Sequence, residues 1–113
     1  MHPFVVLGDP VRRRILEVLA GGEQAAGEVV DAVSPQFGIT QSAVSQQLKV
    51  LRDHGFARVR VDGPRRIYSL DPTPLKDVDA WLAHFRAFWS TAMEELLVEV
   101  ERGKQERQGG EGN

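Results

Sequence analysis

The residues from Thr40 to Leu70 constrain the fold of this chain more than any other part of it. Thr40 is a good helix N-cap, and apolar residues recur at helical spacing behind it until Gly55. Two runs of alternating apolar and polar residues follow, at 56–61 and 66–70, and the Asp62-Gly63 pair between them is a strong hairpin signal. The segment therefore predicts a short helix, a tight glycine turn and a two-stranded, arginine-rich hairpin.

Two helices are predicted before this segment, behind a short apolar lead-in at residues 3–8. Asp9 and Pro10 begin the first as N-cap and first-turn proline, and it runs to about Ala20. The second covers roughly residues 25–33. It is followed at 34–38 by a turn or irregular loop that contains a proline.

A long helix is predicted after the hairpin, from about Leu75 to Arg102, because apolar residues recur along it at helical spacing. Residues 103–113 carry no such stripe and are predicted to be a disordered tail. The domain is therefore expected to occupy residues 1–102. Three helices, a hairpin and a long helix are the order of a winged helix-turn-helix, a mainly α (α+β) fold with a two-stranded wing and a C-terminal dimerisation helix.

Composition limits the class of protein. The 113 residues suffice for one domain, and the absence of cysteine excludes disulfides and thiolate chemistry. No apolar run is long enough to span a bilayer and no signal peptide is visible, so a cytoplasmic protein without a membrane partner is expected. The net charge is only −2, but residues 40–70 hold six basic and two acidic side chains, whereas residues 71–113 hold five and nine.

The helix that begins at Thr40 carries the candidate base-reading residues. In a helix-turn-helix the second helix enters the major groove of double-stranded DNA, where glutamine can pair with adenine and serine with several bases. No acidic residue occurs between Gly38 and Arg52. The residues expected to face DNA are Thr40, Gln41, Ser42, Ser45, Gln46 and Lys49.

Arginines of the hairpin are the candidate phosphate contacts. Arg65 and Arg66 lie just past the tip, where guanidinium groups reach the backbone or the minor groove, and Arg58 and Arg60 lie on the paired strand. Exposed arginines also protect a strand edge from aggregation, which is the alternative for the last two. Arg12, in the first long helix, is a further candidate for a phosphate contact.

Three segments resemble the ArsR family of winged-helix transcriptional repressors. They are LGDPVRRRILEVLA at 7–20, AVSQQLKVLRDHG at 43–55 and GPRRIYSL at 63–70. The final helix, with its tryptophans and phenylalanines, is similar to the SdpR-like, metal-independent branch. The resemblance implies a homodimer that binds an operator palindrome and represses, often its own gene.

Two departures from the family pattern affect the DNA contacts. The family often has histidine at the position of Gln47, and the 34–38 loop with Pro35 is longer than usual. The apolar stripe of the final helix is expected to form a dimer interface together with the apolar N-terminus, because one small core cannot cover it. The expected interface residues are Phe4, Leu75, Val78, Leu82, Phe85, Trp89, Met93 and Leu96.

Other functions are less well supported by the sequence. Asp77, Asp79 and His84 offer too few ligands for a metal, so no metal or other cofactor is expected. The aromatic stripe could instead line a pocket for an apolar effector, whose identity the sequence does not give. A protein-interaction module that has lost DNA binding is a further alternative. No nucleophile with a base or phosphate-binding glycine loop is present, so no catalytic residue is assigned.

Overall fold

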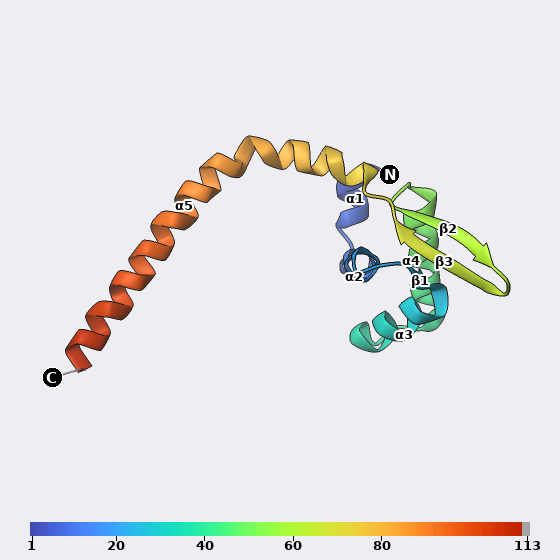
Figure 1. Cartoon of the computed structure of the whole chain (residues 1–113), viewed down its shortest axis with the longest axis horizontal. Coiled ribbons are helices and arrows are strands. Elements are labelled where there is room, and N and C mark those ends of the chain that lie inside the picture. The colour runs from blue at the N-terminus through green and yellow to red at the C-terminus, as the bar shows by residue number, and fades with distance from the viewer. Residues whose placement is uncertain (112–113) are drawn as a thin grey trace. The chain divides into compact units, whose positions relative to one another are not determined.

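The computed structural model describes residues 1–111, with the side chains of residues 104–111 outside the description. Residues 1–78 form one compact unit and the later part of the last helix belongs to a second, so each is described by itself (Figure 1). The elements, in chain order, are α1 (Pro3–Leu7), α2 (Pro10–Ala20), β1 (Gln24–Ala25), α3 (Ala26–Phe37), α4 (Gln41–Asp53), β2 (Ala57–Asp62), β3 (Arg65–Leu70) and α5 (Thr73–Glu111).

Capping interactions fix the starts of α2 and α4 where the sequence predicts them. Asp9 accepts hydrogen bonds from the backbone N–H groups of Val11 and Arg12 at 2.8 and 3.2 Å, and Pro10 occupies the first turn. The Thr40 hydroxyl accepts one from the N–H of Ala43 at 3.1 Å. Both expected helices and their buried faces are confirmed.

Helix α3 corrects the predicted loop at 34–38. The helix continues through Pro35 to Phe37 and ends at Gly38, which adopts a left-handed conformation with φ of 63°. Phe37 packs against the hydrophobic core, and this burial favours a last helical turn despite the proline. The loop before α4 is therefore short, and the predicted turn or irregular loop at 34–38 is wrong.

Two short elements are absent from the sequence-based prediction. Residues 3–7 form helix α1, whose Val6 is fully buried in the core. Residues 24–25 form β1, which pairs antiparallel with β3, so the sheet has three strands in the order β1-β3-β2. Elements of five and two residues are too short to show a periodic pattern, which explains why both were missed.

The hairpin forms as predicted, but β2 begins and ends one residue later than expected, and β3 begins one residue earlier. Asp62 pairs with Arg65, so the turn consists of Gly63 and Pro64. Gly63 has φ of 60°, which a residue with a side chain adopts only at a cost. Arg65 and Arg66 lie next to this tight turn, whereas Arg58 pairs with Ser69 farther down the hairpin.

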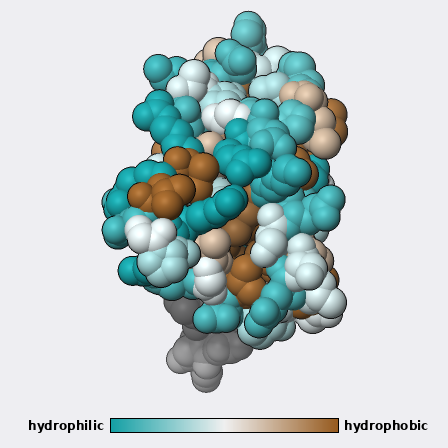
Figure 2. Space-filling model, turned by 90° about the vertical axis from the view of Figure 1, so that its right-hand side faces the viewer, coloured by the Kyte–Doolittle hydropathy of each residue, from teal (hydrophilic) through white to brown (hydrophobic). Residues whose placement is uncertain are grey.

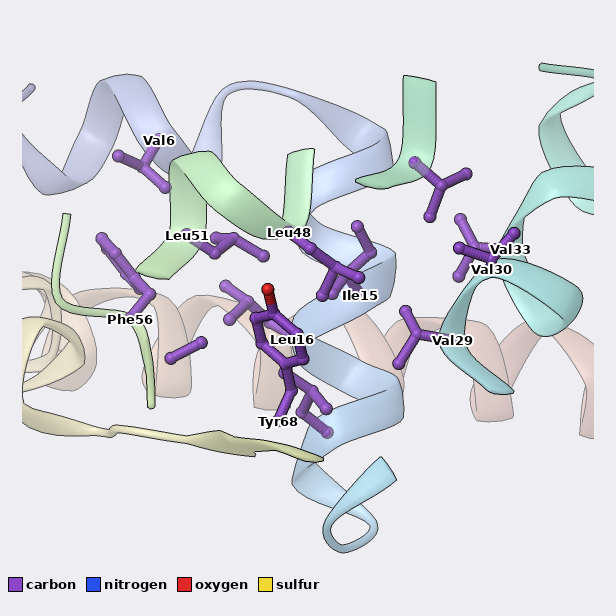
Figure 3. Packing of buried hydrophobic residues seen from close by; sticks show 13 residues of the cluster. Val6, Ile15, Leu16, Val29, Val30, Val33, Leu48, Leu51, Phe56 and Tyr68 are labelled. Atoms are coloured by element: carbon purple, nitrogen blue, oxygen red, sulfur yellow. The ribbon is translucent and has the colours of Figure 1, made fainter. Parts of the chain in front are cut away.

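The core of the first unit joins its helices to the base of the hairpin. Side chains from α1, α2, α3 and α4 meet Phe56 and Tyr68, which are 1% and 5% exposed (Figure 3). Figure 3 shows Leu48 and Leu51 of α4 pointing into this cluster beside Ile15. This buried face fixes the orientation of α4 and thereby determines which of its side chains face solvent.

Helix α5 is longer than predicted. It runs from Thr73 to Glu111, past the expected end at Arg102. Its glutamate, lysine, arginine and glutamine residues are good helix formers, so the helix needs no apolar stripe to continue. The helix bounds thus extend into the segment expected to be a disordered tail, and residues 112–113 lie outside the described residues. No helix in the described part of the chain is both long and apolar enough to cross a membrane.

Candidate nucleic-acid interface

The exposed face of α4 is polar, and its one carboxylate is that of Asp53, the last residue of the helix. All six residues that the sequence assigns to it are exposed, namely Thr40, Gln41, Ser42, Ser45, Gln46 and Lys49. The side of the molecule from which the hairpin projects is predominantly hydrophilic, with hydrophobic residues only in separate small groups (Figure 2). This face can therefore offer hydrogen-bonding groups to base edges without repelling phosphates.

A hollow of about 370 Å³ lies between α4 and β3. Lys49 and Arg52 line it from the helix and Arg66 from the strand, together with Ser45 and the ring of Tyr68. Arg52 is paired with Asp53 at 3.1 Å, so Lys49 and Arg66 are the cations of this hollow that suit a phosphate oxygen directly. Sequence reasoning missed Arg52, although its spacing of seven residues from Ser45 places both on one helical face.

Most hairpin arginines are already paired with carboxylates. Arg58 contacts Asp71 at 3.1 Å, Arg60 contacts Glu23 at 3.2 Å and Arg65 contacts Glu28 at 2.6 Å. Among the described residues, Arg66 has no such partner. The four predicted arginines therefore differ: Arg66 offers an unpaired charge to DNA, and the other three must first leave a carboxylate.

Two of these contacts alter proton affinities. The hydrogen bond and charge of Glu23 raise the pKa of Arg60 above its ordinary value. Hydrogen bonds from the hydroxyl and N–H of Thr73, and secondarily the charge of Arg58, lower the pKa of Asp71. Both shifts favour the charged forms of the two side chains.

Arg12 serves a structural role that the sequence did not reveal. Its guanidinium donates hydrogen bonds to the carbonyl oxygens of Val6 and Val5 at 2.7 and 3.0 Å and to Gln47 Oε1 at 3.0 Å. The side chain is only 12% exposed. These contacts tie α1 and α4 to α2, and a phosphate would have to compete with them for the guanidinium. They also show that Gln47 faces Arg12.

The expected dimer-interface residues lie in two groups. Leu75 packs against the core of the first unit, and Val78 and Leu82 are half-buried. Five are exposed: Phe4, Phe85, Trp89, Met93 and Leu96. The rings of Phe85 and Trp89 stack with centroids 6.5 Å apart. On α5, Trp81 and Phe88 are exposed as well, as expected from the wide apolar stripe, and the exposed Leu97 and Val98 extend it further.

Two of the three residues considered as metal ligands on α5, Asp79 and His84, make other contacts. Asp79 forms an ion pair with Arg86, and His84 Nδ1 lies 3.1 Å from the carbonyl oxygen of Trp81. In the described part of the chain no cluster of three or more histidine, cysteine, aspartate or glutamate residues could hold a metal ion.

Residues 7–60 match a family model described as a helix-turn-helix domain. The chain is 32% identical to the transcriptional repressor SdpR of Bacillus subtilis over 73% of this chain and 87% of that protein. It is 39% identical to the HTH-type transcriptional regulator Rv2034 of Mycobacterium tuberculosis, over 77% and 75% of the two chains.

Solved structures show the same architecture. A possible transcriptional regulator for arsenical resistance matches with a TM-score of 0.63 and 34% identity, over 76% of this chain and 85% of the other. A homodimeric winged helix-turn-helix DNA-binding domain from Mycobacterium bovis matches with a TM-score of 0.55 and 25% identity, over 79% and 76%. The winged-helix prediction is therefore confirmed, with β1 as an additional strand.

Proposed function

The chain belongs to the ArsR family of winged helix-turn-helix transcriptional regulators, and from this premise we propose that it is a homodimeric repressor that binds an operator palindrome. Members of this family regulate transcription and are not enzymes. Helix α4 enters the major groove, and the hairpin contacts the backbone or the minor groove beside it. The protein acts in the cytoplasm, and the genes that it represses include its own.

The observation that carries this proposal is the α4 face. Gln41, Ser42, Ser45 and Gln46 project into solvent while the opposite side of the helix is locked into the core. Lys49 and Arg66 flank these residues at the hollow between helix and strand. Neutral hydrogen-bonding groups bordered by cations are what base edges bordered by phosphates require.

A twofold assembly accounts for the apolar surface of α5. Burying a large apolar side chain contributes about 1.5–3 kcal/mol, and several such side chains are exposed on this helix. The Mycobacterium bovis relative is homodimeric. Two copies related by a twofold axis present their α4 helices to half-sites about 34–36 Å apart along one face of DNA.

Selection of bound duplexes from a random DNA pool, followed by titration of the selected duplex, tests the proposal. Gln46→Ala is expected to reduce discrimination between the selected duplex and single-base variants by about 1–3 kcal/mol. Arg66→Ala is expected to weaken binding to every sequence and to reduce the slope of log affinity against log salt by about 1.

Lys76→Ala is the matched control, because Lys76 is an exposed cation without an ion-pair partner among the described residues and lies outside α4 and the hairpin. It is expected to leave discrimination unchanged and to alter the salt slope less than Arg66→Ala does. Failure of the wild-type chain to enrich any sequence, or to bind any duplex at low salt, contradicts the proposal.

A further inference from the structure

We propose that Glu23 and Glu28 restrain the hairpin arginines by ion pairs that DNA phosphates must displace, and thereby lower the affinity for DNA of every sequence. The inference rests on the proposed DNA binding and names residues that regulate it. Neither glutamate lies on α4 or the hairpin; one precedes β1 and the other lies in the first turn of α3.

Each of the two carboxylates contacts a guanidinium group of the hairpin. Glu28 Oε1 lies 2.6 Å from Arg65 Nη2. Glu23 holds Arg60 through both oxygens, at 3.2 Å from Nε and 3.4 Å from Nη2. The pairing of β1 with β3 brings the β1–α3 junction alongside the hairpin, which explains how residues so distant in sequence meet.

The pairs cancel the charge that the hairpin would otherwise present. Residues 57–70 carry four arginines and one aspartate. Glu23, Glu28 and Asp71 bring three further negative charges against three of those arginines. The hairpin with its partners is therefore neutral overall, and Arg66 is its one arginine without an ion pair in the described part of the chain.

The strength of these pairs suits a restraint that DNA can overcome. All four side chains of the two glutamate pairs are between 53% and 57% exposed, and ion pairs at such positions are weak and screened by salt. A phosphate can therefore displace the carboxylate. The displaced glutamate then remains near the phosphate and repels it. Each ion pair therefore reduces the affinity for DNA that its arginine contributes.

Because phosphate contacts are common to all DNA sequences, the restraint lowers the affinity for every sequence equally. Glu28→Gln keeps the size and the hydrogen-bonding oxygen of the side chain and removes its charge. We expect it to tighten binding to the selected duplex and to a random-sequence duplex by the same factor, roughly two- to five-fold at low salt. The salt slope is expected to become steeper, by at most about 1.

A double-mutant cycle separates the ion pair from the general loss of a negative charge. In the Arg65→Gln background, Glu28→Gln is expected to have little effect on affinity. Asp31→Asn is the matched control: it removes one charge from the same helix, at an exposed residue without an ion pair among those described. Its effect is expected to be smaller and to persist in the Arg65→Gln background.

Fluorescence anisotropy with both duplexes measures all these variants, and the Glu23–Arg60 pair is tested by the same cycle. If Glu28→Gln binds DNA no more tightly than a DNA-binding wild type, the glutamate is no restraint and the inference is overturned. The inference is also overturned if Glu28→Gln tightens DNA binding as strongly in the Arg65→Gln background as in the wild type. If the wild type binds neither duplex, the proposed function itself fails, which is a distinguishable result.

Discussion

At the scale of the residue, Arg12 is a cation that is held inside the fold by hydrogen bonds to the protein itself. The guanidinium satisfies two carbonyl oxygens of α1 and the side-chain oxygen of Gln47 on α4. A buried hydrogen-bonding group that loses its partner incurs a desolvation cost, so these contacts contribute chiefly to the stability of the fold. The residue next to it, Arg13, is exposed and donates to one carbonyl oxygen, that of Leu7.

Arg12→Ala is therefore expected to lower the free energy of unfolding by about 1–3 kcal/mol, because it removes the side-chain donor to the Val6 carbonyl oxygen, whereas the Val5 carbonyl oxygen keeps the N–H of Gly8. Arg13→Ala, the matched control, is expected to cost less than 1 kcal/mol, as is usual at exposed positions. Urea unfolding followed by circular dichroism measures both. Equal losses in the two variants, or a large change in the salt slope of DNA binding in folded Arg12→Ala, contradict the structural role.

At the scale of the element, the turn between α3 and α4 depends on Gly38. This glycine ends α3 in a left-handed conformation, and a Cβ added to it would contact nothing within 4 Å. The cost of a substitution is therefore backbone strain alone, about 1–2 kcal/mol for most residues and less for asparagine.

Gly38→Ala is expected to lower the free energy of unfolding by about 1 kcal/mol, and Gly38→Asn by less. Thermal unfolding of the two variants measures this order. A lower stability for the asparagine variant than for the alanine variant would show that space, and not the backbone conformation, limits the position.

Local signals predicted α2, α4 and the hairpin well because each has a cap or turn residue beside a clear apolar period. Pro35 was misread because its helix-breaking tendency is local, whereas the burial of Phe37 that offsets it is tertiary. The exposed residues of α4 followed from periodicity alone. The partners of Arg58, Arg60 and Arg65 did not, because ion pairs between residues distant in sequence leave no periodic trace.

At the scale of the whole molecule, the chain has a compact unit that carries the proposed DNA-binding face, and a long helix with exposed apolar side chains. Phe85, Trp89, Met93 and Leu96 recur at spacings of three and four residues and therefore share one face of α5. All four are exposed, Met93 by 54%. A second copy of this chain is the proposed cover, which makes assembly and operator binding interdependent.

Met93→Glu is therefore expected to shift the protein from dimer to monomer, because the interface would have to bury an unpaired charge. Thr91→Glu adds the same charge on the opposite side of the helix and is expected to leave the dimer intact. Sedimentation equilibrium measures the assembly, and anisotropy measures binding to the selected duplex. Since a monomer engages only one half-site, its affinity is expected to fall by about tenfold or more. A dimeric Met93→Glu variant with undiminished affinity would place the interface elsewhere than on this face of α5.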